Sequence, residues 1–289
     1  MWPSMCSVCH DHFRNHMESL TPRSYLFVPG NRPERYAKAI AAGADAVIVD
    51  LEDAVPPKDK TSARAALAAW LSPEHPVLIR VNGAESSWFR EDLALCKTPG
   101  VAGVLLPKAQ RIEDIRLLAE HSGAATPILP LIETARGFWN AHALAQGPRV
   151  QRFVFGSIDF QIDLGIQGEE EELLYFRSQL VLVSRIAGLE PPVDGVTTAI
   201  DDAERVRADT LRARRLGFGA KLCIHPRQVS PVNECFVPTA EEESWARRIM
   251  EAAEAAQGAA VAVEGKMVDR PVIARAEAIL RRIKQRGGR

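Results

Sequence analysis

The feature that most constrains the fold is a regular alternation of short apolar runs and amphipathic stretches, which begins at Arg23. Short apolar runs between helical patterns are typical of strands that are buried on both faces of a parallel sheet. The predicted strands cover residues 25–28, 46–51, 77–81, 103–107, 128–132, 153–155, 195–198 and 220–224. The predicted helices include residues 33–42, 60–71, 112–119, 172–187 and 203–216.

Eight strands that are each followed by a helix predict an α/β fold, a (β/α)8 TIM barrel. A doubly wound open sheet is the alternative, because the order of strands within a sheet does not follow from one sequence. We expect a disordered extension at residues 1–22, the barrel at residues 23–239 and a C-terminal helical arm at residues 240–289. The arm is more than a barrel requires, so we expect it to pack on a neighbouring subunit or to cover the site.

Charge and apolar patterning exclude several classes of protein. The 36 Lys and Arg residues are balanced by 37 Asp and Glu, which gives a net charge of −1. There is no basic excess for nucleic acid, and no apolar stretch approaches the ~18 residues expected of a membrane span. The beginning of the sequence lacks the apolar core of a signal peptide. We therefore expect a cytoplasmic enzyme that binds neither nucleic acid nor a membrane.

The five cysteines are an odd number without the spacing of a disulfide framework, and reduced thiols are the simplest interpretation. The run Cys6-Ser-Val-Cys9-His10 matches the spacing of haem attachment, and His12 adds a possible zinc ligand. Haem attachment normally needs export, and a zinc site needs further ligands nearby. We interpret this run as a chance match.

Polar residues follow most of the predicted strands at the point where each strand ends. In a (β/α)8 barrel the catalytic groups collect at the carboxyl ends of the strands, so these side chains are expected to form one polar pocket. The residues concerned are Asp50, Glu52, Asp53, Arg80, Asn82, Lys108, Glu133, Asp159 and His225.

Two of these acids suit a metal ion. Glu133 and Asp159 each end an apolar run, and Mg²⁺ is bound by one or two carboxylates while it keeps waters and accepts substrate oxygens. We predict Mg²⁺ at this pair, with Mn²⁺ as the alternative ion. Arg80 offers a fixed fork of donors that suits a carboxylate or a developing enolate.

The three acids at residues 50–53 have several possible roles. They could bind metal-bound waters, orient Arg80 or Lys108, or act as acid and base groups. Their clustering should raise at least one pKa unless a cation compensates. We predict Arg80 and Glu52 as catalytic, and Asp50, Arg80 and Lys108 as substrate-binding.

Each of these residues also has a structural interpretation. Glu133 could pair with Arg136, Asp159 could cap the next helix, and Lys108 could be solvated. We expect His225 to be a hydrogen-bonded barrel residue rather than a catalyst.

We expect Trp88 and Trp139 to be packing residues. The sequence has no dinucleotide-binding glycine motif, no Walker-type loop and no nucleophile elbow. A lysine that forms a Schiff base is possible, but no apolar environment singles out Lys108 or Lys221.

Longer motifs around these residues carry a family resemblance. They are Arg23-Ser-Tyr-Leu-Phe-Val-Pro-Gly-Asn-Arg-Pro-Glu-Arg35, Gly43-Ala-Asp-Ala-Val-Ile-Val-Asp-Leu-Glu-Asp-Ala-Val55, Ile79-Arg-Val-Asn82, Leu106-Pro-Lys108, Leu131-Ile-Glu-Thr-Ala-Arg-Gly137, Gly219-Ala-Lys-Leu-Cys-Ile-His-Pro226 and Gly265-Lys-Met-Val-Asp269-Arg-Pro271. Through them the sequence resembles the citrate lyase β-subunit-like branch of the HpcH/HpaI aldolase superfamily, near the malyl- and citramalyl-CoA lyases.

The resemblance implies more than the spacing does. Relatives are (β/α)8 barrels, commonly trimers, that use Mg²⁺ to make or break a bond between a 2-oxo acid and an acyl thioester enolate. Glu133 and Asp159 match the metal ligands, and Arg80 matches the residue that contacts the oxo-acid oxygen. Asp269 matches a base on the arm that acts across the subunit interface. We therefore expect a homotrimer or hexamer, with coenzyme A entering as part of an acyl-CoA substrate.

One motif departs from the family pattern. Relatives usually have Gly-x-Glu-Asp-Leu where this chain has Gly156-Ser-Ile-Asp-Phe160. Asp159 is kept, but Ile158 and Phe160 indicate altered surroundings of the metal or an altered substrate pocket. We predict a Mg²⁺-dependent carbon–carbon lyase that acts on a 3-hydroxy-acyl-CoA such as citramalyl-, malyl- or citryl-CoA. The alternatives are a CoA-independent class II aldolase on 4-hydroxy-2-oxo acids, an acyl-CoA thioesterase and a catalytically silent acyl-CoA-binding paralogue.

Overall fold

The computed structural model describes residues 21–255, 261–263 and 266–287. The predicted N-terminal extension and the run at residues 6–10 fall almost wholly outside the described residues. The chain folds into two compact units, one that spans Pro22–Phe236 and a C-terminal one that begins at Val237.

Eight parallel strands close the first unit into a barrel in which each strand pairs with its sequence neighbours and β8 pairs with β1. The strands are β1 (Ser24–Pro29), β2 (Ala46–Asp50), β3 (Val77–Arg80), β4 (Val101–Leu106), β5 (Ile128–Ile132), β6 (Val154–Phe155), β7 (Val193–Asp194) and β8 (Ala220–Cys223). The closed order confirms the predicted TIM barrel and excludes the open sheet.

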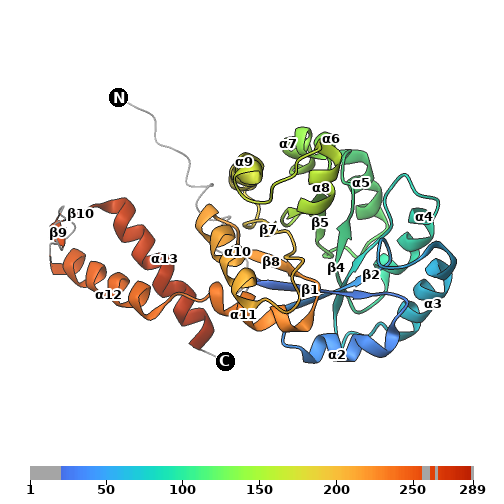
Figure 1. Cartoon of the computed structure of the whole chain (residues 1–289), viewed down its shortest axis with the longest axis horizontal. Helices are drawn as coiled ribbons and strands as arrows, with labels where there is room; N and C mark the ends of the chain where they lie inside the picture. Colours follow the sequence, from blue (N-terminus) through green and yellow to red (C-terminus); the bar gives the residue numbers. More distant parts are fainter. Residues whose placement is uncertain (1–20, 256–260, 264–265, 288–289) are drawn as a thin grey trace. The chain divides into compact units, whose positions relative to one another are not determined.

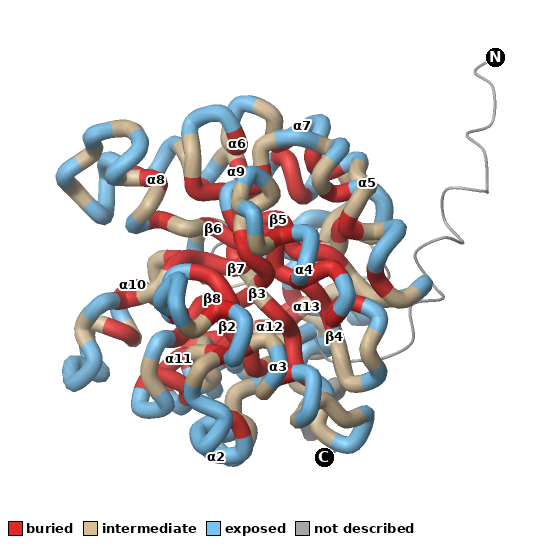
Figure 2. The backbone as a smooth tube through the Cα atoms, turned by 90° about the vertical axis from the view of Figure 1, so that its right-hand side faces the viewer, coloured by how far each residue is buried: buried red, intermediate tan, exposed pale blue. Residues whose placement is uncertain are grey.

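Helices surround the strands, and their outer faces are exposed while the strands are buried (Figures 1 and 2). The α-helices are α2 (Tyr36–Ala41), α3 (Lys60–Trp70), α4 (Phe89–Asp92), α5 (Ile112–Glu120), α6 (Ala135–Trp139), α7 (Ala141–Leu144), α8 (Ser157–Leu164), α9 (Leu174–Ile186), α10 (Ala203–Leu216) and α11 (Val229–Cys235). Short 3-10 turns are η1 (Pro33–Arg35), η2 (Pro57–Asp59), η3 (Leu93–Lys97), η4 (Glu171–Leu173) and η5 (Pro226–Gln228).

The core has two layers because successive side chains of a strand point to opposite faces. In β4, Leu105 belongs to a cluster inside the barrel to which every strand contributes, whereas Val104 and Leu106 belong to the larger cluster beneath the helices. The cysteines of this unit, Cys96 and Cys223 among them, are buried free thiols.

The position of the seventh strand was predicted wrongly. The prediction placed it at residues 195–198, but the strand is Val193–Asp194. Asp194 is fully buried, donated to by Arg177 at 2.9 Å and 3.6 Å from the Lys221 ammonium. Because Asp194 is charged, the segment that contains it lacks the apolar run that predicts a buried strand. Its charge is neutralised only in the folded structure, by partners from α9 and β8.

The C-terminal unit consists of α12 (Ala240–Ala255), a hairpin of β9 (Val261–Val263) and β10 (Lys266–Val268), and α13 (Arg270–Gly287). It has an apolar core of its own, which includes Ile249, Val268 and Ile279. Within the described residues, no helix combines the length and the apolar character that crossing a bilayer requires.

Candidate active site

An arginine–aspartate pair lies at the carboxyl ends of β2 and β3. Asp50 and Arg80 are register partners and the last residues of their strands. Arg80 donates from Nε and from NH2 to the two oxygens of Asp50, both at 2.6 Å. Asp50 is 1% exposed and also accepts the backbone N–H groups of Glu52 and Ala54 at 2.9 and 3.0 Å. Two fork-like hydrogen bonds fix the plane of the guanidinium, so Asp50 orients Arg80.

Glu52 lies on the other side of the same guanidinium. Its Oε2 is 3.2 Å from Arg80 NH1, and its Oε1 accepts from Lys108 Nζ at 2.5 Å. Burial raises the pKa of Glu52, although Arg80 and Lys108 oppose the rise. Asp53 is more exposed and lies 3.7 Å from Arg80 NH1. Three acids therefore share one arginine and one lysine.

Lys108 joins two of the acids through different atoms. Its side chain reaches Glu52, while its backbone N–H donates to Glu133 Oε1 at 2.7 Å. Lys108 has a φ of 48°, in the left-handed region that side chains other than glycine rarely adopt. Such conformations persist where the surrounding structure holds them, and here the two carboxylates do so.

Glu133 follows directly after β5 and is 2% exposed. Burial raises its pKa to about 8, and the neighbouring charges of Glu52 and Asp159 add to the rise. Gly156, after β6, allows the carboxylate to lie against the chain, because a Cβ there would be 2.6 Å from both Cβ and Oε2 of Glu133. This corner of the barrel has more negative charge than its cations balance.

The sequence had suggested that Asp159 lies at the end of a strand, and this prediction was wrong. Strand β6 ends at Phe155, and Asp159 is in the first turn of α8, a helix that was not predicted. The side chain nevertheless reaches the same place, because Arg80, Glu133 and Asp159 line one cavity of about 420 Å³.

A second cavity of about 530 Å³ adjoins the first and shares Asp53 and Ala54 with it. It is lined by Glu52, Lys108 and Trp88 among others. The structure thus brings the predicted barrel residues other than His225 to one rim, divided between two neighbouring cavities.

Some predicted residues lie elsewhere or have structural partners. His225 caps η5 and accepts the backbone N–H of Arg227 at 3.2 Å, as expected of a structural histidine. Trp139 is 87% exposed, so its prediction as a packing residue was wrong. Asp269 is exposed in the C-terminal unit, where its carboxylate accepts the backbone N–H of Val272 at 3.4 Å, in the first turn of α13.

Sequence reasoning missed Lys60, the first residue of α3. It is 6% exposed and donates to the carbonyl oxygens of Leu51 and Glu52 and to Asn82 Oδ1 at 2.6–2.7 Å. Lys60 therefore ties the loop after β2 to the loop after β3. A lysine in the first turn of a helix interacts unfavourably with the helix dipole. This position was the signal in the sequence that Lys60 has a specific partner.

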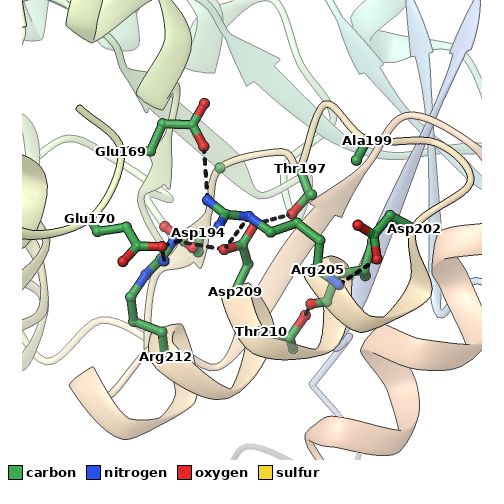
Figure 3. A network of polar contacts seen from close by, with 12 residues as sticks. Glu169, Glu170, Asp194, Thr197, Ala199, Asp202, Arg205, Asp209, Thr210 and Arg212 are labelled. Carbon is green, nitrogen blue, oxygen red and sulfur yellow. Dashed lines mark hydrogen bonds and ion pairs between the residues drawn. The ribbon is translucent and has the colours of Figure 1, made fainter. Parts of the chain in front are cut away.

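A polar network holds the loop that follows β7 (Figure 3). Thr197 donates to Asp209 at 2.7 Å, and Asp209 lies 3.4 Å from Arg205 and 3.1 Å from Arg212. The two arginines also reach Glu169 and Glu170 in the segment before η4. The network fixes the loop that brings Val196 to the wall of the first cavity.

Comparison with known proteins shows which family this chain matches. Residues 23–226 match the model of a family described as HpcH/HpaI aldolase/citrate lyase. A citrate lyase subunit beta-like protein of Deinococcus radiodurans is 39% identical over 276 residues, which cover 89% of this chain and 96% of the relative. A (3S)-malyl-CoA thioesterase of Cereibacter sphaeroides is 36% identical over 277 residues, which cover 89% and 95%.

A crystal structure of similar architecture supports the same grouping. The protein CitE of Mycobacterium tuberculosis, in complex with magnesium, acetoacetate and coenzyme A, is 35% identical and superposes with a TM-score of 0.82. The match covers 93% of this chain and 100% of the other.

Proposed function

Because the chain belongs to the HpcH/HpaI aldolase/citrate lyase family, we propose that it is a Mg²⁺-dependent carbon–carbon lyase. The substrate is a 3-hydroxy-acyl-CoA, which is cleaved reversibly to an acyl-CoA and a 2-oxo acid. The observation that carries this proposal is the excess of acid in one cavity, where a buried Glu133 with a pKa of about 8 accompanies Asp159 and Arg80.

The donor set of Glu133 and Asp159 fits the ion. Burial and neighbouring acids disfavour the charged form of Glu133, so a divalent cation would supply the charge that the site lacks. No group of three or more His, Cys, Asp and Glu side chains suited to a metal is found among the described residues. Two carboxylates suit Mg²⁺, or Mn²⁺, which completes its shell with water and substrate oxygens. When bound, the ion acts as a Lewis acid and template for the hydroxyl and carboxylate of the substrate.

The arginine has a defined part in this reaction. Asp50 holds Arg80 by two of its five N–H groups, NH1 lies 3.2 Å from Glu52 and 3.7 Å from Asp53, and the arginine lines the first cavity. In cleavage, a base removes the hydroxyl proton, the carbonyl of the oxo acid forms, and the bonding electron pair passes to the carbon next to the thioester. Arg80 stabilises the developing charge, a contribution of about 3–4 kcal/mol per donor at comparable sites.

Two acids move protons in the proposed reaction. Asp269 is the base that takes the hydroxyl proton, supplied by the C-terminal unit of a neighbouring subunit in a homotrimer or hexamer, as the family resemblance implies. Glu52 then gives a proton to the carbon of the enolate. Its pKa is raised by burial, and Lys108 at 2.5 Å holds the carboxyl in place. Asp50 and Lys108 thus act by positioning charged groups beside the substrate.

Thioester hydrolysis is a second candidate because a relative of 36% identity is a (3S)-malyl-CoA thioesterase. In that reaction water attacks the thioester carbonyl, the carbon–sulfur bond breaks, and free coenzyme A leaves together with an intact hydroxy acid. No 2-oxo acid is formed, so the two reactions differ in their products.

The test is a panel of malyl-CoA, citramalyl-CoA and citryl-CoA, assayed with Mg²⁺ and with EDTA. We expect Mg²⁺-dependent release of a 2-oxo acid from at least one of them, and its loss in Glu133→Gln and in Asp159→Asn. Glu120→Gln, which changes an exposed acid at the end of α5, is the matched control and should keep full activity. Full turnover in both carboxylate variants would show that the metal assignment is wrong.

A further inference from the structure

Two partly exposed isoleucines line the cavity that contains Arg80, Glu133 and Asp159. Ile158 is 38% exposed and Ile224 is 40% exposed, and both line this cavity. Apolar surface in a concave site of this size is typical of a wall that a ligand covers.

The charges of the same cavity limit what that ligand can carry. Among the described residues that line it, Arg80 is the only cation, and Asp50 already occupies its Nε and one N–H of NH2. The next cation, Lys108, donates to Glu52 at 2.5 Å. A bound divalent ion and Arg80 can balance one substrate carboxylate. A second carboxylate would have no cation to balance it among the described residues that line this cavity, beside acids and apolar side chains, which is unfavourable.

From these two observations we infer the class of oxo acid, on the premise of the proposed lyase function. The 2-oxo acid that this protein releases carries a short alkyl group on its carbonyl carbon, rather than a carboxylate-bearing chain. Ile158 is the residue that selects for it.

The position of Ile158 explains why this residue decides the preference. It is the second residue of α8, directly before Asp159, whereas its neighbours Ser157 and Phe160 are buried. The Ile158 side chain is therefore not part of the core, and it lies beside the proposed metal ligand, on the wall of the cavity. Val196 contributes to the same wall from the loop that the Thr197–Asp209 hydrogen bond anchors (Figure 3).

The inference is tested by equilibrium binding, which does not require turnover. Pyruvate, 2-oxobutyrate and fresh oxaloacetate are titrated by calorimetry into the full-length protein saturated with Mg²⁺, and again into the protein in EDTA. Each buried methylene should tighten binding about fourfold, so 2-oxobutyrate should bind about fourfold more tightly than pyruvate. Oxaloacetate should bind at least about tenfold more weakly than pyruvate because no second cation lines the cavity to balance its second carboxylate.

Ile158→Ala should bring the affinities of 2-oxobutyrate and pyruvate to within about twofold of each other, because part of the alkyl wall is removed. Ile162→Ala is the matched control, since Ile162 lies on the same helix, is 74% exposed and does not line the cavity. It should leave the ratio unchanged.

Three results overturn the inference. Oxaloacetate that binds as tightly as pyruvate would refute the oxo-acid class, and an alkyl preference that survives in Ile158→Ala would refute the role of Ile158. The lyase proposal stands in both cases. Absence of Mg²⁺-dependent binding for all three acids would refute both the oxo-acid class and the lyase proposal.

Discussion

The close approach of Gly156 to Glu133 gives the sharpest test of the site geometry. The change is Gly156→Ala, which adds one methyl group. The φ of Gly156 is −86°, a value that alanine adopts freely, so the effect is steric rather than conformational.

The size of the effect follows from the distances. The new Cβ would lie 2.6 Å from both Cβ and Oε2 of Glu133. Carbon atoms in contact prefer about 3.5–4.0 Å, so Glu133 has to move by about 1 Å. Overpacking of this kind destabilises a protein by about 1–3 kcal/mol. Mutation of a residue that supports a metal ligand, as Gly156 supports Glu133, lowers metal affinity by about 10–100-fold at comparable sites.

The assay is calorimetric titration of Mg²⁺, with urea unfolding in EDTA measured alongside. Gly83→Ala is the matched control, because Gly83 lies in the loop after β3 and a Cβ there would meet nothing within 4 Å. We expect weaker Mg²⁺ binding in Gly156→Ala and unchanged binding in Gly83→Ala. Equal Mg²⁺ affinity in Gly156→Ala and wild type would refute the placement of the ion at Glu133.

Three further predictions concern Asp50, Glu133 and Asp269. Asp50→Asn should lower the free energy of unfolding by about 1–3 kcal/mol in urea, because Arg80 keeps Glu52 and Asp53 nearby but loses the carboxylate that accepts from its Nε and NH2; an unchanged free energy of unfolding would contradict this. Burial raises the pKa of Glu133 from 4.5 to about 8, so the folded metal-free protein holds a proton that the unfolded chain releases. Its stability should therefore fall as the pH rises from about 4.5 to about 8, and Mg²⁺ affinity should increase over the upper part of that range. Calorimetry and urea unfolding at several pH values check both, and a Glu133→Gln variant with the same pH slopes would refute them. Asp269→Asn should abolish turnover without changing Mg²⁺ affinity, measured by product assay and calorimetry; retained turnover would remove this residue from the mechanism.

The strands were predictable where their buried faces are apolar. The runs that became β2, β4 and β5 have few polar residues, and their limits were close to those observed. Strand β7 was misplaced because Asp194 is buried with Arg177 and Lys221, which are 17 and 27 positions away along the chain. The compensation that makes such a charge tolerable is a tertiary contact, and it leaves no local signal.

The residues of the candidate site also divide into those that the sequence predicted correctly and those that depend on tertiary contacts. Arg80 and Glu133 were predicted because barrel strands end at one rim, and both lie there. Asp159 was placed on the wrong element, although it lines the same cavity from the first turn of α8. The need for glycine at position 156 comes from the approach of a side chain on a neighbouring strand end, so only the folded structure reveals it.

The central claim is that the protein breaks a carbon–carbon bond and leaves the thioester intact. The most direct test is to measure 2-oxo acid, acyl-CoA and free thiol together as citramalyl-CoA is consumed, with Mg²⁺ and with EDTA. We expect one pyruvate and one acetyl-CoA for each substrate molecule, only when Mg²⁺ is present. Free coenzyme A released without pyruvate would contradict it.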